Sequence, residues 1–171
     1  YLRRYAEGYD KEMQRVAGNP MITFAYPEDA LEAGIVNEYA ILADMAIYVL
    51  TRASGEGKDR DMTKKIMLGD REYEIGDYLL SPTELRNLEH ISSAFRNTVL
   101  LLNTGGIIDM GFLSKLERIG AVLLMGQAGQ EGGNAVLDVL TGKVTPSGKL
   151  TDTWAANYHD YPASETFGYN D

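Results

Sequence analysis

Residues 80–106, LSPTELRNLEHISSAFRNTVLLLNTGG, carry the clearest indication of the fold class. The start of the segment, SPTE at 81–84, predicts a helix N-terminus, because the serine can cap the first turn, the proline suits it and the glutamate can close a capping box. An apolar run at Thr98–Leu102 then has the composition of a parallel strand covered on both faces. A polar turn with glycines follows at 103–106. Helix, buried strand and turn in this order predict an α/β sheet.

The same theme recurs on either side of this segment. Two further apolar runs, Ala46–Leu50 and Ala121–Met125, have strand composition, and a helix is expected at 132–140. Because strand-helix-strand connections are right-handed crossovers, we expect an open, mostly parallel sheet flanked by helices on both faces, an α/β sandwich. The other elements predicted are helices at 2–16, up to Ala43 and at 110–118, and a last strand at 149–154.

The segment 51–77 departs from this theme. It is long, charged and dotted with glycines, and Leu68-Gly69-Asp70-Arg71 has the composition of a hairpin tip. Long connections on compact domains are commonly functional. We therefore interpret 51–77 as a long active-site-type loop within a single domain that spans 1–171.

Composition narrows the classes of partner and cofactor. Sixteen Lys and Arg against 25 Asp and Glu give a net charge of -9, which disfavours binding to nucleic acid and to anionic membranes. There is no Cys, so disulfides and thiolate nucleophiles are excluded, and the two His residues match no metal-ligand spacing. We predict no metal and no cofactor. The absence of Cys and of Asn-x-Ser/Thr sequons fits a bacterial cytoplasmic protein, and a secreted protein is the alternative.

Three glycine-containing connections are candidates for the site of chemistry. In an open parallel sheet, ligands bind outside the carboxyl ends of the strands, so the residues directly after each apolar run are the ones to inspect. These are 51–60, 103–106 and 126–133. Glycine allows the backbone to approach a ligand closely. The alternative is that the glycines only form tight turns.

Glu56 is the candidate for proton transfer. It lies between two glycines, so its carboxyl group sits on a deformable stem, and a carboxyl group can donate a proton when its pKa is raised. The alternative is an ordinary solvated acid. Asp59 and Arg60 fit an ion pair that braces the loop better than they fit a chemical role. The turn at 126–133 matches neither G-x-G-x-x-G nor a Walker A loop, so a nucleotide site is only an alternative.

Five blocks of this chain resemble the α/β sandwich domain of glycoside hydrolase family 3, the β-glucosidase and β-xylosidase family. Their order and spacing are similar to those of the family, and the likeness runs from about Asp44 to Tyr161. The blocks are SGEGKDR at 54–60, LSPTE at 80–84, LLNTG at 101–105, GQEGGNA at 129–135 and PSGKL at 146–150.

The resemblance implies part of a retaining exo-glycosidase, in which one carboxylate attacks the anomeric carbon while a second acid protonates the departing oxygen. In the family the nucleophile is an Asp on a separate (β/α)8 barrel. By the resemblance, Glu56 is the acid/base residue, and Ser54, Asp59 and Arg60 are neighbours that bind substrate or brace the loop. The implied substrate is a β-linked glucoside or a related oligosaccharide.

The departures from the family pattern concern what this chain lacks. Family sandwich domains begin with a strand that has no counterpart here, and the chain opens with Tyr1 rather than Met, so we expect a fragment whose sheet is incomplete at its N-terminal edge. A chain of 171 residues cannot also hold a barrel of about 250 residues. We therefore expect the fragment alone to be inactive. A non-catalytic scaffold or carbohydrate-contacting domain is the alternative, and a nucleotide-binding α/β protein is a third reading.

Overall fold

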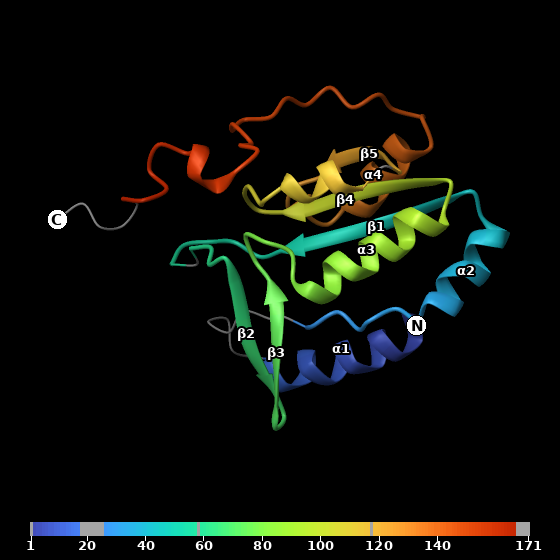
Figure 1. The fold of residues 1–171 in the computed structure, drawn as a ribbon, viewed down its shortest axis with the longest axis horizontal. Helices are drawn as coiled ribbons and strands as arrows, with labels where there is room; N and C mark the ends of the chain where they lie inside the picture. Colours follow the sequence, from blue (N-terminus) through green and yellow to red (C-terminus); the bar gives the residue numbers. More distant parts are fainter. Residues whose placement is uncertain (1, 18–25, 58, 117, 167–171) are drawn as a thin grey trace.

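The centre of the fold is a three-stranded parallel sheet, seen in a computed structural model that describes residues 2–17, 26–57, 59–116 and 118–166. The strands are β1 (Met45–Arg52), β4 (Asn97–Thr104) and β5 (Ile119–Leu124), in the spatial order β1-β4-β5. Both strand pairs are parallel, so the three carboxyl ends lie along one edge (Figure 1). The predicted mostly parallel α/β sheet is confirmed.

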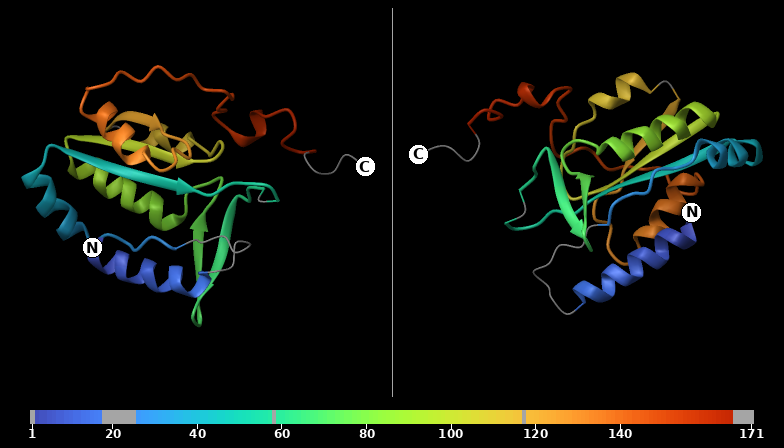
Figure 2. Two further views of the ribbon diagram at one scale, coloured as in Figure 1. Left: turned by 180° about the vertical axis from the view of Figure 1, so that it is seen from behind. Right: turned by 60° about the horizontal axis from the view of Figure 1, so that its bottom comes forward.

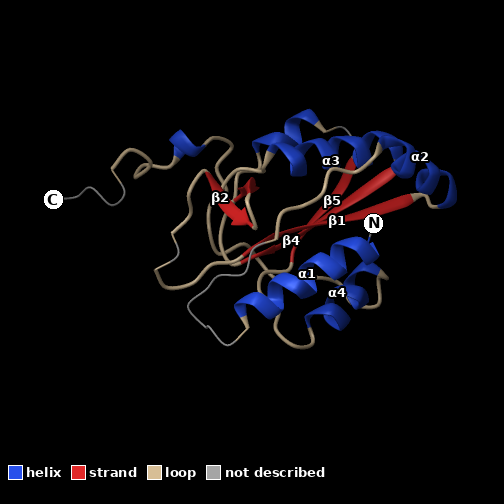
Figure 3. Cartoon of the chain, turned by 90° about the horizontal axis from the view of Figure 1, so that it is seen from below, coloured by secondary structure: helices blue, strands red, loops and turns tan. Residues whose placement is uncertain are grey.

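Helices lie on both faces of this sheet, as predicted. On one side α3 (Pro82–Ala94) packs against β1 and β4, with α2 (Ala33–Leu42) beside it. On the other side lie α1 (Leu2–Val16) and α4 (Gly132–Leu140), which Figure 3 shows with the sheet between the two layers. None of the described helices combines the length and the apolar character needed to cross a bilayer.

The core lies between the sheet and α3. Side chains alternate across a strand, so the even-numbered residues of β1 and β4, such as Leu50 and Leu100, point toward the helix. Each fully buried leucine contributes roughly 1.5–3 kcal/mol relative to an exposed one. The buried cluster comprises Tyr48, Leu50, Leu88, Leu100, Leu102, Ile108, Phe112 and Leu116.

The second face of β1 is more open than its apolar composition predicts. Ile47 and Val49 point away from α3 and are about half exposed, at 47% and 49%. A nearly continuous apolar run such as Ala46–Leu50 is typical of a parallel strand covered on both faces. β1 lies at one edge of the sheet, and its outer face receives less cover from the described helices than the face toward α3.

The predicted start of α3 is confirmed in atomic detail. Ser81 Oγ accepts a hydrogen bond of 3.2 Å from the Glu84 backbone N–H, and the Ser81 N–H donates one of 2.8 Å to Glu84 Oε2. Pro82 is the first helical residue. Two backbone donors that the helix itself leaves unpaired are satisfied in this way.

The segment 51–77 contains regular structure as well as a loop. An antiparallel hairpin of β2 (Thr63–Leu68) and β3 (Arg71–Gly76) turns at Gly69, whose φ of +61° favours glycine. The tip predicted at 68–71 is therefore confirmed, and the loop proper shrinks to the residues between β1 and β2. Figures 1 and 2 show the hairpin standing apart from the central sheet.

Two predicted elements take another form. The helix expected at 110–118 is a short 3-10 helix, η1 (Gly111–Lys115). The strand expected at 149–154 is wrong: this segment pairs with no described strand, and the chain instead follows the surface as far as a second 3-10 helix, η2 (Tyr158–Asp160) (Figure 1). Leu150 is 61% exposed, so only Trp154 of this segment packs against the core cluster. A strand in this segment would bury too little apolar surface to be stable.

Candidate active site

Three connections meet at the carboxyl edge of the sheet. Thr51 of β1 is in register with Asn103 of β4, so the chain segments that follow both strands leave the sheet together. The Ser54 hydroxyl donates a hydrogen bond of 2.7 Å to the carbonyl oxygen of Gly105. A side chain at Gly105 would collide with Ser54 Oγ and approach Gln127, which belongs to the connection after β5. Ser54, a predicted neighbour of the site, thus joins two of the three candidate connections.

Glu56 lies at the tip of the connection between β1 and β2. It is exposed, and no hydrogen bond or ion pair joins its carboxylate to another described residue. Gly57 next to it has a φ of +67°, a conformation that an L side chain strains. The carboxylate is therefore presented to the outside of the chain by a turn that needs glycine.

Arg60 is fixed by a partner that sequence analysis missed. Arg60 Nη1 lies 3.0 Å from Asp77 Oδ1, and Asp77 is only 3% exposed. The predicted ion pair between Asp59 and Arg60 is therefore wrong. Arg60 is turned inward toward Asp77, whereas Asp59 is exposed and contributes its backbone carbonyl, 3.4 Å from Lys64 Nζ. The bracing expected of Arg60 thus runs to a residue 17 positions away.

Asp77 binds three donors through its two carboxylate oxygens. Besides Arg60 at Oδ1, the Asp61 N–H donates to Oδ2 at 2.8 Å, and Lys64 Nζ lies 2.6 Å from the same oxygen. Burial by itself raises the pKa of Asp77, but the bonds from Lys64, from the Asp61 backbone and from Arg60 outweigh it, so the pKa is lowered. Asp77 is a buried anion at neutral pH.

Arg52 anchors the other end of the same connection. This last residue of β1 is buried, and its guanidinium forms two hydrogen bonds of 2.8 Å to the two carboxylate oxygens of Glu84. Its Nε donates to the carbonyl oxygen of Asp77 at 2.9 Å. Any side chain at Gly76 would collide with this ion pair. One signal was available in the sequence: strand alternation places Arg52 on the same inward face as Tyr48 and Leu50.

A second, half-buried carboxyl group lies on the α3 side of the sheet. Glu28 accepts hydrogen bonds from the Tyr48 hydroxyl at 2.6 Å and from Asn87 Nδ2 at 2.7 Å. Burial raises the pKa of Glu28, and these two bonds offset the effect only in part. Glu28 joins the segment before α2 to α3 and is a structural group.

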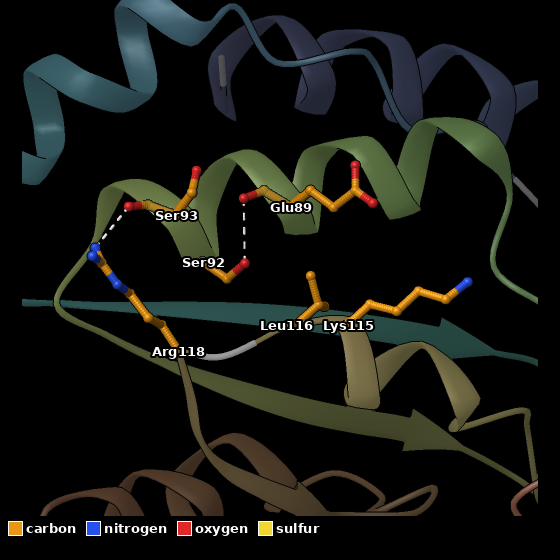
Figure 4. Close-up of a pocket in the computed structure, with 6 residues that line it drawn as sticks. All are labelled: Glu89, Ser92, Ser93, Lys115, Leu116 and Arg118. Carbon is orange, nitrogen blue, oxygen red and sulfur yellow. Dashed lines mark hydrogen bonds between the residues drawn. The ribbon is translucent and has the colours of Figure 1, made fainter.

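A surface hollow of about 420 Å³ lies beside the C-terminal half of α3, and Figure 4 shows the side chains that line it. Arg118 Nη1 crosses its rim and donates to the Ser93 carbonyl oxygen at 2.8 Å. The hollow lies near the start of β5, at the amino end of the sheet, and so is remote from the connection that carries Glu56. Its lining consists of Glu89, Ser92, Ser93, Lys115, Leu116 and Arg118.

Metal coordination has no candidate in the described ranges, where no three His, Asp or Glu side chains gather as a ligand set. Two arginines near the carboxyl edge are instead paired with carboxylates, Arg52 with Glu84 and Arg60 with Asp77. Glu56 differs from these paired groups because its exposed carboxylate has no such partner among the described residues, and the same holds for the carboxylate of Asp59.

Comparison with known proteins identifies relatives that carry this domain. Beta-glucosidase A from Butyrivibrio fibrisolvens is 36% identical over 155 residues, which cover 84% of this chain and 19% of that protein. A beta-glucosidase from Ruminococcus albus is 35% identical over 144 residues, covering 84% of this chain and 14% of its own length. The chain thus spans about a fifth or less of these two relatives.

Solved structures share the fold over nearly the whole chain. Beta-glucosidase 3B from Thermotoga neapolitana, in complex with glucose, superposes with a TM-score of 0.79 at 31% identity over 99% of this chain and 23% of that one. A beta-glucosidase from Paenibacillus barengoltzii gives 0.77 at 32% identity over 97% of this chain and 18% of that one. The family model for the glycosyl hydrolase family 3 C-terminal domain matches residues 5–171. With its sheet, its helices and the SGEGKDR connection in place, the chain belongs to glycosyl hydrolase family 3, as a C-terminal domain of that family.

Proposed function

We propose that this domain forms one wall of the active site of a retaining β-glucosidase and supplies Glu56 as the acid/base residue. The observation that carries the proposal is the environment of Glu56: its carboxylate is exposed and unpaired among the described residues, whereas its loop is bonded to buried groups at both ends. Relatives named beta-glucosidases and a neighbour solved with glucose support the substrate class.

The proposed reaction needs two carboxyl groups, and this chain contributes one of them. In the first step, Glu56 gives its proton to the glycosidic oxygen as that oxygen leaves, while a carboxylate of a companion barrel domain forms a bond to the anomeric carbon. In the second step, Glu56, now ionised, takes a proton from water as the water oxygen displaces the enzyme carboxylate. Each cycle returns both groups to their starting states.

The companion domain also explains how an exposed carboxyl group becomes an acid. Docking of a second domain and of the sugar removes water from Glu56, and the nearby nucleophile is negatively charged. Both effects raise the pKa of a carboxyl group, as the acid step requires. On this proposal the isolated chain has no hydrolase activity, because it lacks the nucleophile.

The test is Glu56→Gln in the full-length protein that contains this chain, measured on two glucosides. With cellobiose, whose leaving group needs a proton, we expect kcat/KM to fall by about 10²–10⁴-fold. The leaving group of 2,4-dinitrophenyl β-glucoside departs as a stable anion. With this substrate we expect kcat/KM, which reports the formation of the covalent intermediate, to stay near the wild-type value. Equal losses on both substrates would contradict the acid role.

Glu131→Gln is the matched control. Glu131 lies in the glycine-rich connection after β5, at the same edge of the sheet, but its Oε2 is bonded to Asn134 Nδ2 at 2.7 Å. We expect it to leave the ratio of the two activities unchanged. Full activity of Glu56→Gln on both substrates would favour the alternative, a scaffold or carbohydrate-contacting domain without a catalytic group.

A further inference from the structure

Asp77 is a buried carboxylate that the proposed reaction does not use directly. It follows β3 and precedes α3, and every donor to its side chain comes from a single stretch of the chain, residues 60–64. That stretch comprises the C-terminal arm of the loop that carries Glu56 and the first two residues of β2. The bonds from Arg60, Asp61 and Lys64 tie this arm to one carboxylate.

The backbone reinforces this attachment. The Tyr78 N–H donates to the Asp61 carbonyl oxygen and the Leu79 N–H to that of Met62, each at 2.9 Å. Residues 61–62 therefore run beside 78–79 as a paired segment. The C-terminal arm of the loop has little freedom to shift without breaking the bonds to Asp77.

The N-terminal arm of the loop is attached to the same residue. Arg52 Nε donates to the backbone carbonyl oxygen of Asp77, and Glu84 holds the rest of the guanidinium group. Ser54, two residues after Arg52, adds a hydrogen bond to the carbonyl oxygen of Gly105. Asp77 thus holds the N-terminal arm through its main chain and the C-terminal arm through its side chain, while the tip at 55–57 has no comparable bond among the described residues.

We infer that Asp77 is a positioning residue that fixes where the tip of the loop presents Glu56. This inference rests on the proposed role of Glu56. A loop held at both ends limits the region that a tip of a few residues can reach, and a misplacement of about 1 Å can cost about 10²-fold in rate. The charge of Asp77 matters because two of its three donors, Arg60 and Lys64, are cations.

The experiment uses the full-length protein that contains this chain and compares Asp77→Asn with Glu56→Gln. Asp77→Asn keeps the shape but removes the charge. With cellobiose we expect kcat/KM, which reports the first step, to fall by about 10²-fold. With 2,4-dinitrophenyl β-glucoside, whose leaving group needs no proton, we expect kcat/KM to fall much less. A role limited to folding would lower both activities by the same factor.

Neighbouring lysines give a matched pair in case Asp77→Asn fails to fold. Lys64 and Lys65 are neighbours on β2. Lys64→Met removes a donor to Asp77, whereas Lys65→Met removes an exposed ion pair with Glu72 of β3. We expect Lys64→Met to change the ratio of the two activities in the same direction as Asp77→Asn, and Lys65→Met to leave it at the wild-type value. Arg60→Lys, which keeps the charge, is expected to retain more cellobiose activity than Arg60→Met.

Two outcomes separate the inference from the proposal on which it rests. If Glu56→Gln changes the activity ratio but folded Asp77→Asn and Lys64→Met do not, Asp77 does not position the acid and the inference is overturned. If Glu56→Gln itself loses both activities equally, the failure lies in the proposed function.

Hydrogen exchange gives a readout without substrate: the Asp61 amide should exchange faster in Asp77→Asn, and unchanged protection would also overturn the inference.

Discussion

Glu56 and Asp77 are two carboxylates on the same connection between β1 and α3, and they differ in almost every physical respect. Glu56 is exposed at the tip of a turn and has no partner among the described residues, whereas Asp77 is buried and holds three donors. The difference separates two tasks that one site requires. A carboxyl group that must exchange a proton has to be accessible, and a carboxylate that must fix geometry has to be paired.

The largest effect on stability is expected when the ion pair between Arg52 and Glu84, at the N-terminal end of the loop, is removed. Arg52→Met leaves the Glu84 carboxylate, whose side chain is only 12% exposed, without its guanidinium partner, and removing one partner of a buried pair typically costs about 3–5 kcal/mol. Urea unfolding of the chain, followed by circular dichroism, measures this loss. Arg52→Met combined with Glu84→Met should recover part of it, since no buried charge is then unpaired. A single variant as stable as the wild type would mean that water replaces the guanidinium.

Local sequence signals predicted the three strands of the central sheet and the capping box of α3 correctly, because their determinants lie within a few residues of one another. The pairs that hold the loop join Arg52 to Glu84 and Arg60 to Asp77, across 32 and 17 positions, so they depend on packing. Glu56 could be proposed from its flanking glycines and the family resemblance. Its anchors could not, because many charges in this chain were equally available as partners for Arg60.

The next largest effect concerns the pH dependence of stability. Asp77 has a pKa below its ordinary value of 3.8, so on acidification the unfolded chain takes up the proton first. The stabilisation is present above about that pH and is lost as the pH falls through the lowered native pKa. Asp77→Asn should flatten this acid limb and cost about 1–3 kcal/mol at pH 6. Thermal unfolding of both proteins between pH 2 and 7 measures it.

Glu28 provides the control with the opposite sign. Burial raises the pKa of Glu28 above its ordinary value of 4.5, so the native state keeps a proton that the unfolded chain has released. Its contribution is present below that value and is lost as the pH rises through the raised native pKa. Glu28→Gln should therefore reduce the loss of stability that occurs as the pH rises through the native pKa of Glu28. An unchanged acid limb in Asp77→Asn would show that other carboxyl groups dominate it.

A smaller effect is expected at the tip of the loop. Gly57 has a φ of +67° and open space around it, so Gly57→Ala introduces backbone strain without a collision, about 1–2 kcal/mol. Gly133→Ala is the matched control, since Gly133 also faces open space but lies in α4 without a positive φ. There alanine should stabilise the helix by up to about 1 kcal/mol. If both variants unfold at the same urea concentration, the turn at Gly57 has relaxed to another conformation.

The smallest effect is expected from an ion pair that geometry alone would rank highly. Lys65 lies 2.7 Å from Glu72, almost as close as Lys64 lies to Asp77 at 2.6 Å. The Lys65 and Glu72 side chains are 68% and 54% exposed, so solvent and salt screen the pair, whereas Asp77 is buried. Lys65→Met should leave the urea midpoint unchanged, while Lys64→Met lowers it. Equal shifts of the urea midpoint for the two lysines would mean that distance, and not burial of the partner, sets the strength of these ion pairs. Asp77 would then be no stronger an ion-pair partner than an exposed carboxylate.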